Sequence, residues 1–155
     1  MSIEWGPWYR ETLDGLTATL EAAAVDWATN SQRDPWIILG QKRPSGIEYP
    51  HAMVLSFSRR RDAVESSRSH ELHRIDTDIA VFQQGDALEP EEMLLSTLEE
   101  MAAVESALDA DRTLGGTVEH TSIDQADAFE LETNIGRELV GNLQLTITKE
   151  ARLLE

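Results

Sequence analysis

The sequence predicts an α+β fold in which two amphipathic helices pack against a mostly antiparallel sheet of about four or five strands. Two patterns carry this prediction. Two long segments repeat apolar residues at helical spacing, and several shorter segments alternate apolar with polar residues. The segments follow one another in the order α-β-β-β-α-β-β, without an internal repeat. A chain of 155 residues has room for one buried core, so residues 1–155 are predicted to form a single domain.

The first helix is predicted over residues 7–28. Pro7 is tolerated in a first helical turn. The apolar residues that follow it recur at helical spacing: Leu13, Leu16, Leu20, Ala24 and Trp27. The polar residues between them, Thr12 and Thr19 included, are assigned to the solvated face. Turn-forming residues at 30–35 end the helix.

Three strands are predicted before the second helix. Residues 36–39 form a short apolar run bounded by a proline and a glycine, which is typical of a buried strand. A second strand is predicted over residues 51–58, and a third over residues 70–82, where apolar and polar residues alternate most regularly. Residues 59–68 form a polar connector, so the second and third strands are expected to pair as an antiparallel hairpin.

The second helix is predicted over residues 90–109. A proline and two glutamates open it, where the helix dipole favours negative charge. The residues assigned to its buried side are Leu94, Leu95, Leu98, Met101, Ala102, Val104 and Leu108. The chain then reverses at Leu114, Gly115 and Gly116. Glycine readily adopts the positive φ that ends a helix, and Leu114 can fold back as the hydrophobic contact of the cap, so these residues predict a tight structural corner.

Two strands are predicted after this corner. Residues 118–123 form a strand that starts without delay, and residues 124–134 are predicted as an acidic loop with one helical turn. Residues 139–149 alternate well and are predicted as the last strand, with these residues facing inward: Leu139, Gly141, Leu143, Leu145 and Ile147.

The chain is strongly acidic, with 29 acidic and 13 basic residues and a formal net charge of −16. Only Lys42 and Lys149 are lysines. An acidic surface repels itself at low ionic strength, and at about 1 M salt, where the Debye length is roughly 3 Å, this repulsion is screened. The composition therefore predicts a protein of a halophilic host; the alternative is an ordinary acidic protein. The same charge argues against non-specific binding of nucleic acid.

The composition also bears on compartment and chemistry. The absence of cysteine excludes disulfides, thiolate metal sites and cysteine nucleophiles. No apolar run approaches the roughly 18 residues that a membrane helix requires, and the first residues lack the basic and apolar regions of a secretion signal. We therefore expect neither insertion into a membrane nor secretion.

No catalytic or metal-binding constellation emerges from the residue spacing. His70 and His73 are three residues apart, which on a strand sends them to opposite faces, and His120 lies far along the chain. Asp76 and Asp78 share a strand face, but no lysine or histidine is reliably aimed at them. The serines lack the glycine elbow of a nucleophile, and the glycines lack the spacing of a phosphate loop. We expect no enzyme activity, no metal and no cofactor.

Two groups of residues are candidates for an interface. The first is a concentration of basic residues: Arg59, Arg60, Arg61 and Arg68. These arginines form either a solvated connector paired with nearby acids, or a contact loop that meets an acidic neighbour such as another copy, another protein or packaged DNA. The second group is Trp5 and Trp8, near the N-terminus, which are either a local packing contact or anchors for a partner.

The element order and three local phrases resemble the tail-terminator proteins of long-tailed viruses. The phrases are residues 48–54 (EYPHAMV), 75–81 (IDTDIAV) and 111–118 (DRTLGGTV). In that family a helix runs into a leucine and glycines and then a strand, followed by a final alternating strand. The resemblance covers most of the chain in layout, and its motifs are short.

This resemblance implies a non-enzymatic ring, usually a hexamer, that caps the tail tube, stops its polymerisation and joins the tail to the head. The implied partners are other copies of the chain, the tail tube protein and the head-tail connector or stopper protein. DNA would pass through without specific binding. The protein would lie in the tail or neck of the virion, after assembly in the host cytoplasm.

The chain departs from the family in its extreme acidity and in its long first helix with Trp5 and Trp8. The acidity fits a virus of a halophilic archaeon. The long first helix leaves open which surface of the protein would face the head. Two other functions stay open as well. One is another neck or head-completion protein, such as a stopper or adaptor, and the other is a small ligand-binding regulatory α+β module.

Overall fold

The computed structural model describes residues 3–29, 35–62, 70–84, 89–133 and 136–152, which form two helices and five strands. In chain order the elements are α1 (Trp5–Ala22), β1 (Ile37–Leu39), β2 (His51–Asp62), β3 (His70–Gln84), α2 (Pro90–Ala110), β4 (His120–Thr133) and β5 (Gly136–Arg152). The predicted α+β fold and its order α-β-β-β-α-β-β are confirmed.

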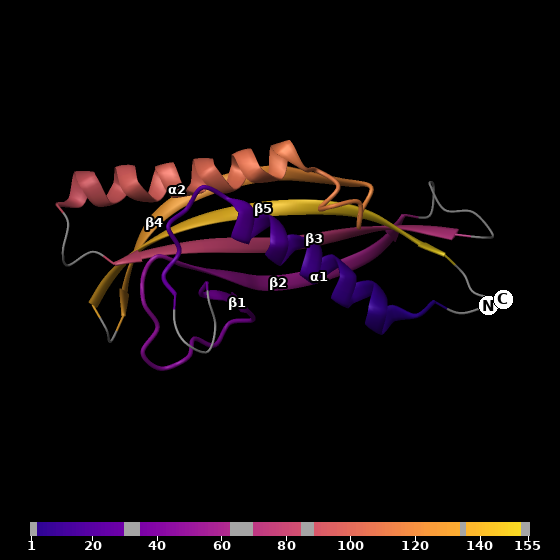
Figure 1. The fold of residues 1–155 in the computed structure, drawn as a ribbon, viewed down its shortest axis with the longest axis horizontal. Coiled ribbons are helices and arrows are strands. Elements are labelled where there is room, and N and C mark those ends of the chain that lie inside the picture. The colour runs from indigo at the N-terminus through magenta and orange to yellow at the C-terminus, as the bar shows by residue number, and fades with distance from the viewer. Residues whose placement is uncertain (1–2, 30–34, 63–69, 85–88, 134–135, 153–155) are drawn as a thin grey trace.

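The five strands form one sheet in the order β1-β2-β3-β5-β4 (Figure 1). β1 runs parallel to β2 and the other neighbouring pairs are antiparallel, so the sheet is mostly antiparallel as predicted. β2 and β3 form the expected hairpin, with Phe57 opposite Thr77. The register shifts between Ile123 and Gln125 in β4, where a bulge adds a residue to the strand.

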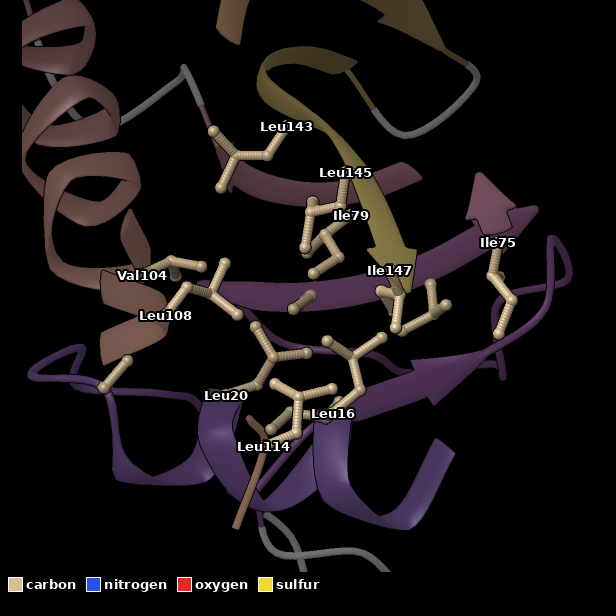
Figure 2. Close-up of a cluster of buried hydrophobic side chains, with 14 of the residues drawn as sticks. Leu16, Leu20, Ile75, Ile79, Val104, Leu108, Leu114, Leu143, Leu145 and Ile147 are labelled. Carbon is tan, nitrogen blue, oxygen red and sulfur yellow. The ribbon is translucent and has the colours of Figure 1, made fainter. Parts of the chain in front are cut away.

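The main core lies between one face of the sheet and both helices. Figure 2 shows the side chains that meet there, among them Leu16 and Leu20 of α1, Val104 and Leu108 of α2, and Ile79, Leu143, Leu145 and Ile147 of the sheet. Full burial of each such side chain contributes about 1.5–3 kcal/mol. The predicted alternation of the last strand is confirmed, because its inward residues are all buried.

A smaller apolar cluster lies on the opposite face of the sheet. Its buried members are Trp36, Ile38, Met53, Ala80, Phe82 and Val140. Farther along the same strands this face becomes polar, with a shallow depression lined by Ser56, Asp76, Asp78 and Gln144 among others. The helices therefore cover one face, while the other is apolar at one end and acidic in the middle.

The first helix is shorter than predicted, and two of its polar residues are buried. α1 ends at Ala22, yet Trp27 still packs into the core because its indole nitrogen donates to the Leu20 carbonyl at 2.9 Å. Thr12 and Thr19, assigned to the solvated face, are buried. Each of their hydroxyls donates to the carbonyl four residues earlier at 2.9 Å, which satisfies the polar group inside the core.

Two segments predicted as loops are strand. β2 continues beyond residue 58 through the three arginines to Asp62, and β4 covers residues 120–133, where an acidic loop was predicted from residue 124. Charged side chains on both segments reach solvent, so their polarity does not oppose strand formation. In β4 the inward positions Ile123 and Ala128 still contact the core.

The corner after α2 is confirmed as a positive-φ turn. Leu114, Gly115 and Gly116 have φ values of 49°, 73° and 83°, and the Leu114 side chain is buried. The Gly115 amide donates to the Asp111 carboxylate at 2.7 Å, which caps the turn. The following strand begins at His120, slightly later than expected.

Candidate assembly surfaces

An arginine–aromatic stack joins the first turn of α1 to the distal half of β2. The Arg59 guanidinium carbon lies 3.6 Å from the centroid of the Trp5 ring and 5.7 Å from that of Tyr9. An exposed cation–π contact of this kind contributes about 0.5–1 kcal/mol. Because Arg59 is exposed and Trp5 is half-buried, the stack presents an aromatic and cationic surface to solvent.

Trp8 belongs to the core, unlike Trp5. Only 8% of its surface is exposed, and its indole nitrogen donates to the Glu150 carbonyl at 3.0 Å. The Lys149 ammonium donates to the Trp8 carbonyl at 3.0 Å and to the Thr12 hydroxyl at 2.9 Å, and burial lowers the pKa of Lys149. These bonds fasten α1 to β5.

Arg60 and Arg61 lie in β2 and not in a connector. Their side chains are 64% and 48% exposed, and they contact Asp76 at 3.8 Å and Glu71 at 3.1 Å. Exposed ion pairs of this kind contribute about 0–1 kcal/mol, so both guanidinium groups remain available to another carboxylate. Because successive strand residues point to opposite faces, Arg61 lies on the helix side and Arg60 on the other. Arg68 lies outside the described residues.

α2 turns three leucines toward solvent that the sequence pattern assigned to the core. Leu94, Leu95 and Leu98 keep 42%, 52% and 43% of their surface exposed. The buried side of the helix consists of Met93, Thr97, Met101, Val104 and Leu108. The prediction that these leucines are buried is therefore wrong.

The sheet decides which side of α2 is buried. Thr97 can face inward because its hydroxyl donates to the Met93 carbonyl at 2.9 Å. Gly141 of β5 lets the helix approach closely, since a Cβ there would stand 2.5 Å from the Met101 side chain. Both apolar stripes of α2 have helical spacing, so periodicity could not choose between them. The glycine in the middle of β5 was the signal that could have done so.

α2 and β4 carry acidic residues but no lysine or arginine. The acidic residues are Glu91, Glu92, Glu99, Glu100, Glu105 and Asp109 in α2, and Asp124, Asp127, Glu130 and Glu132 in β4. β4 is an edge strand and also exposes Phe129 and Leu131, at 45% and 39%. Exposed apolar side chains on both elements therefore lie in strongly acidic surroundings.

Glu100 differs from its acidic neighbours because it points back toward the sheet. The Gln83 amide nitrogen donates to its Oε1 at 2.8 Å, while its Oε2 is buried without a hydrogen-bond partner. Burial raises the pKa of Glu100 to about 7. The carboxyl therefore exchanges its proton close to neutral pH.

A polar cluster fastens the segment before β2 to the sheet face opposite the helices. Arg43 forms an ion pair with the buried Glu138, and the Tyr49 hydroxyl donates to the same carboxylate at 2.7 Å. The Arg43 guanidinium also lies 4.2 Å from the centroid of the Phe82 ring. Burial, followed by the Glu138 carboxylate, raises the pKa of Tyr49 to about 12, and burial lowers the pKa of His51 to about 4. These contacts are directed within the chain and serve the fold.

A hollow of about 300 Å³ lies between α1 and α2. Its lining consists mostly of small residues: Gly15, Ala18, Thr19, Ala22, Ala107, Ala110, Asp111, Leu114 and Gly115. The two polar side chains among them already bond within the chain, Thr19 to the Gly15 carbonyl and Asp111 to the Gly115 amide. The hollow can accept a small apolar group, but it has no free polar side chain among its lining residues to orient that group.

The histidines weighed as metal ligands have other surroundings. His73 is buried, lies 5.2 Å from Trp5 and 5.7 Å from Trp8 between ring centroids, and bonds to Glu71 at 2.9 Å. Among the residues that the structure describes, no group of three or more His, Asp or Glu side chains is arranged to hold a metal ion. Neither helix in this part of the chain is long and apolar enough to cross a membrane.

The chain matches no protein-family model and no curated protein. Among solved structures, its fold is similar to a chain described as "Virion of native gene transfer agent (GTA) particle". The TM-score is 0.46 and the sequence identity 11%, over 86% of this chain and 90% of that chain. At this level of similarity the function has to be argued from the chain's own residues.

Proposed function

We propose that this protein is a non-enzymatic structural protein of a virion that assembles into a hexameric ring. The ring caps the tail tube, stops its polymerisation and joins the tail to the head connector. The proposal starts from the resemblance of residues 48–54, 75–81 and 111–118 to tail-terminator proteins. The order of helices and strands on which that resemblance depends is present in the fold.

The exposed leucines of α2 are the observation that carries an assembly role. Leu94, Leu95 and Leu98 lie on one helix within two turns, and each exposes more than two fifths of its surface. Single exposed leucines are common, whereas a contiguous apolar patch on a soluble protein marks a contact with another molecule. A protein whose task is to be assembled needs such a surface, and a monomeric regulatory module does not.

The acidic charge is consistent with a channel through which DNA passes without being bound. The sheet face opposite the helices carries Asp76, Asp78 and Asp124 around one depression, and the chain as a whole has a net charge of −16. Phosphate is repelled by such a surface, so a ring lumen lined by this chain would let DNA slide. The proposed location is the tail or neck of the virion, after assembly in the host cytoplasm, without a cofactor.

The hollow between α1 and α2 is the observation that favours a second candidate, a small ligand-binding module. Its volume of about 300 Å³ is at the lower end of ligand pockets. Such pockets usually hold a few polar groups that orient the ligand, and here Thr19 and Asp111 are already bonded within the chain. Another neck or head-completion protein remains the nearer alternative, because it would use the same kind of exposed surface.

Mass measurement of the protein in concentrated salt, alone and beside tail tubes, tests the assembly role. We expect a ring of several copies, seen by electron microscopy at the tube end. A protein that stays a monomer or dimer under both conditions would refute the ring. A ring that joins the head connector but ignores the tube would favour another neck protein.

A further inference from the structure

Three consecutive arginines lie on β2, whereas α2 and β4 carry acidic residues without a lysine or arginine. In the strand order β1-β2-β3-β5-β4, the arginine-bearing strand β2 is separated from β4 by two strands. Three interstrand spacings amount to about 14 Å. α2 packs over β3, β5 and β4, so it belongs to the side of β4 (Figure 1). The two surfaces are far enough apart to contact different molecules at once.

The first of these surfaces is called the acidic edge. It consists of the outward side of α2, with Glu91, Leu94, Leu95, Leu98 and Glu99, together with the edge strand β4. The leucines provide apolar area and the glutamates flank them. α2 and β4 contain no lysine or arginine, and the two cations beside them, Arg112 and Arg137, pair with Asp109 at the end of α2 and Glu130 on β4 rather than with the glutamates that flank the leucines.

The second surface is called the arginine edge. It consists of Trp5, Tyr9, Arg59, Arg60 and Arg61 on the first turns of α1 and the distal half of β2. Trp5 and Tyr9 are half-buried and the Arg59 guanidinium lies over the Trp5 ring, while Arg60 and Arg61 project into solvent. Tryptophan, tyrosine and arginine are the residue types that most often dominate binding at protein interfaces.

We propose that the acidic edge of one copy binds the arginine edge of the next copy, an inference that rests on the proposed ring. The exposed leucines pack against the aromatic rings, and Arg61, on the same side of the sheet as Trp5, pairs with the glutamates that flank the leucines. Arg60 points to the other face of β2 and adds positive charge to the rim of the contact. The acidic edge carries negative charge and the arginine edge positive charge, and both contain apolar side chains. The two complementary surfaces therefore belong to the same chain. The occupant of the leucine face is therefore a second copy.

The same charges disfavour a contact in which like surfaces meet. Two acidic edges that face each other place carboxylates opposite carboxylates, and two arginine edges repel in the same way. A dimer with a two-fold axis, in which a surface meets itself, is thus disfavoured. A contact between two different surfaces leaves one of each unused at the ends, so it can repeat, and the chain of subunits closes into a ring where the rotation between successive copies allows it.

Concentrated salt is compatible with this contact. At about 1 M salt the Debye length is roughly 3 Å, which removes long-range repulsion between acidic subunits but preserves pairs in direct contact. The apolar part of the interface, Leu94, Leu95 and Leu98 against Trp5 and Tyr9, does not depend on charge. Ring formation is therefore expected to require salt and not to be abolished by it.

Two variants that each disable one surface test the proposal by mixing. The acidic-edge variant carries Leu94→Ser and Leu98→Ser, and the arginine-edge variant carries Arg60→Glu and Arg61→Glu. All four side chains are exposed, so both variants should fold. Mass is measured in about 2 M KCl, where repulsion is screened. Alone, each variant is expected to stay a monomer under conditions in which the wild type forms rings.

The mixture of the two variants gives the distinctive result. The intact acidic edge of one variant can bind the intact arginine edge of the other, and the disabled surfaces stop further growth. We expect a one-to-one complex of twice the monomer mass and no ring. Either variant forming rings alone, the mixture forming rings, or the mixture showing no complex would each overturn the assignment of the surfaces.

Matched controls exclude effects of exposure or net charge. Leu39→Ser removes a leucine of similar exposure, 48%, that lies outside both surfaces. Lys42→Glu combined with Arg152→Glu, whose side chain is 86% exposed at the end of β5, changes the net charge by the same amount as the arginine-edge variant. Both controls are expected to form rings like the wild type. If charge reversal disturbs folding, as judged by circular dichroism, Arg60→Ser with Arg61→Ser replaces it with the same expected result.

The failure of this inference differs from the failure of the proposed function. Rings formed equally by the wild type and by both edge variants would show that other surfaces join the copies, while the ring itself stands. A wild type that forms no ring, alone or beside tail tubes, would refute the proposed function and this inference with it.

Discussion

Gly15 marks the closest approach between α1 and the corner that follows α2. A Cβ at this position would stand 2.5 Å from the Thr117 hydroxyl and 2.9 Å from the Leu114 carbonyl oxygen. Neither contact is tolerable, and the carbonyl is backbone that cannot rotate away. We expect Gly15→Ala to lower the free energy of unfolding by about 1–3 kcal/mol, as overpacking usually does. Chemical denaturation in concentrated salt measures this change.

Gly6 provides the matched control in the same helix. A Cβ there meets no atom within 4 Å, so Gly6→Ala is expected to leave stability unchanged or to raise it by up to about 1 kcal/mol through helix propensity. If Gly15→Ala and Gly6→Ala gave equal stabilities, the close packing of α1 on the corner would be contradicted.

Glu100 makes stability depend on pH. Its pKa is raised from 4.5 to about 7 by burial, so the folded state holds a proton that the unfolded state has lost. Stability contributed by this proton is complete below pH 4.5 and is lost as the pH rises to about 7. Above that value we expect Glu100→Gln to be about 1–2 kcal/mol more stable than the wild type, a figure discounted for partial exposure.

Unfolding at pH 5 and pH 8 in the same salt checks this prediction. The advantage of Glu100→Gln should shrink at the lower pH, where the folded wild type keeps its proton. Glu99→Gln, on the exposed side of the helix, serves as the control and should show no such trend. His51 also titrates below neutral pH but contributes equally to each protein, so it cancels in the comparison. A variant less stable than the wild type at pH 8 would contradict the assignment.

At the scale of elements, the corner after α2 was predicted closely because glycine chemistry determines it locally. Gly115 and Gly116 have the positive φ that was expected, and Leu114 is buried against the main core. We expect Leu114→Ala to cost about 2–5 kcal/mol, since it removes a fully buried side chain. Gly115→Ala, where φ is 73° and space is open, should cost about 1 kcal/mol from backbone strain alone.

Denaturation of these two variants at one salt concentration checks the order of the two effects. A Leu114→Ala protein that is no less stable than Gly115→Ala would show that the leucine is not part of the core. The predicted order follows from burial, because Leu114 is 1% exposed whereas no atom lies within 4 Å of the missing Gly115 Cβ.

The helices and strands were less predictable where tertiary packing chooses between equal local patterns. α2 has two apolar stripes, and the pattern alone favoured the one with Leu94 and Leu98. Gly141 on β5 and the self-satisfied Thr97 turn the other stripe inward. Similarly, the arginines of β2 and the acids of β4 suggested loops, because charge in an edge strand cannot be distinguished from charge in a loop by composition.

At the scale of the whole molecule, the predicted fold class rested on element order, and that order is confirmed. The candidate surfaces were only partly predictable. The arginines at 59–61 and, as a separate group, Trp5 and Trp8 were predicted as interface candidates. The structure brings Arg59 and Trp5 together, whereas Trp8 lies in the core. The leucine face on α2 was missed, since its exposure depends on how the helix rolls over the sheet, a property that no local pattern encodes.

The net charge makes a prediction that concerns the whole chain. Repulsion among the acidic residues disfavours the compact state at low salt, and screening relieves it. With a net charge of −16, we expect the thermal midpoint of unfolding to rise as KCl increases from about 0.1 to about 2 M. Circular dichroism followed across this series measures the midpoint. A midpoint indifferent to salt would contradict a halophilic origin.

If copies of this chain form a ring that caps a tail tube, the ring should be visible at the end of a growing tube. Growing tail tubes are incubated with the wild-type protein in concentrated salt and observed by electron microscopy. We expect a ring at one end of each tube and tubes that no longer lengthen. Bare tube ends, continued growth and a protein that remains monomeric in the same sample would contradict it.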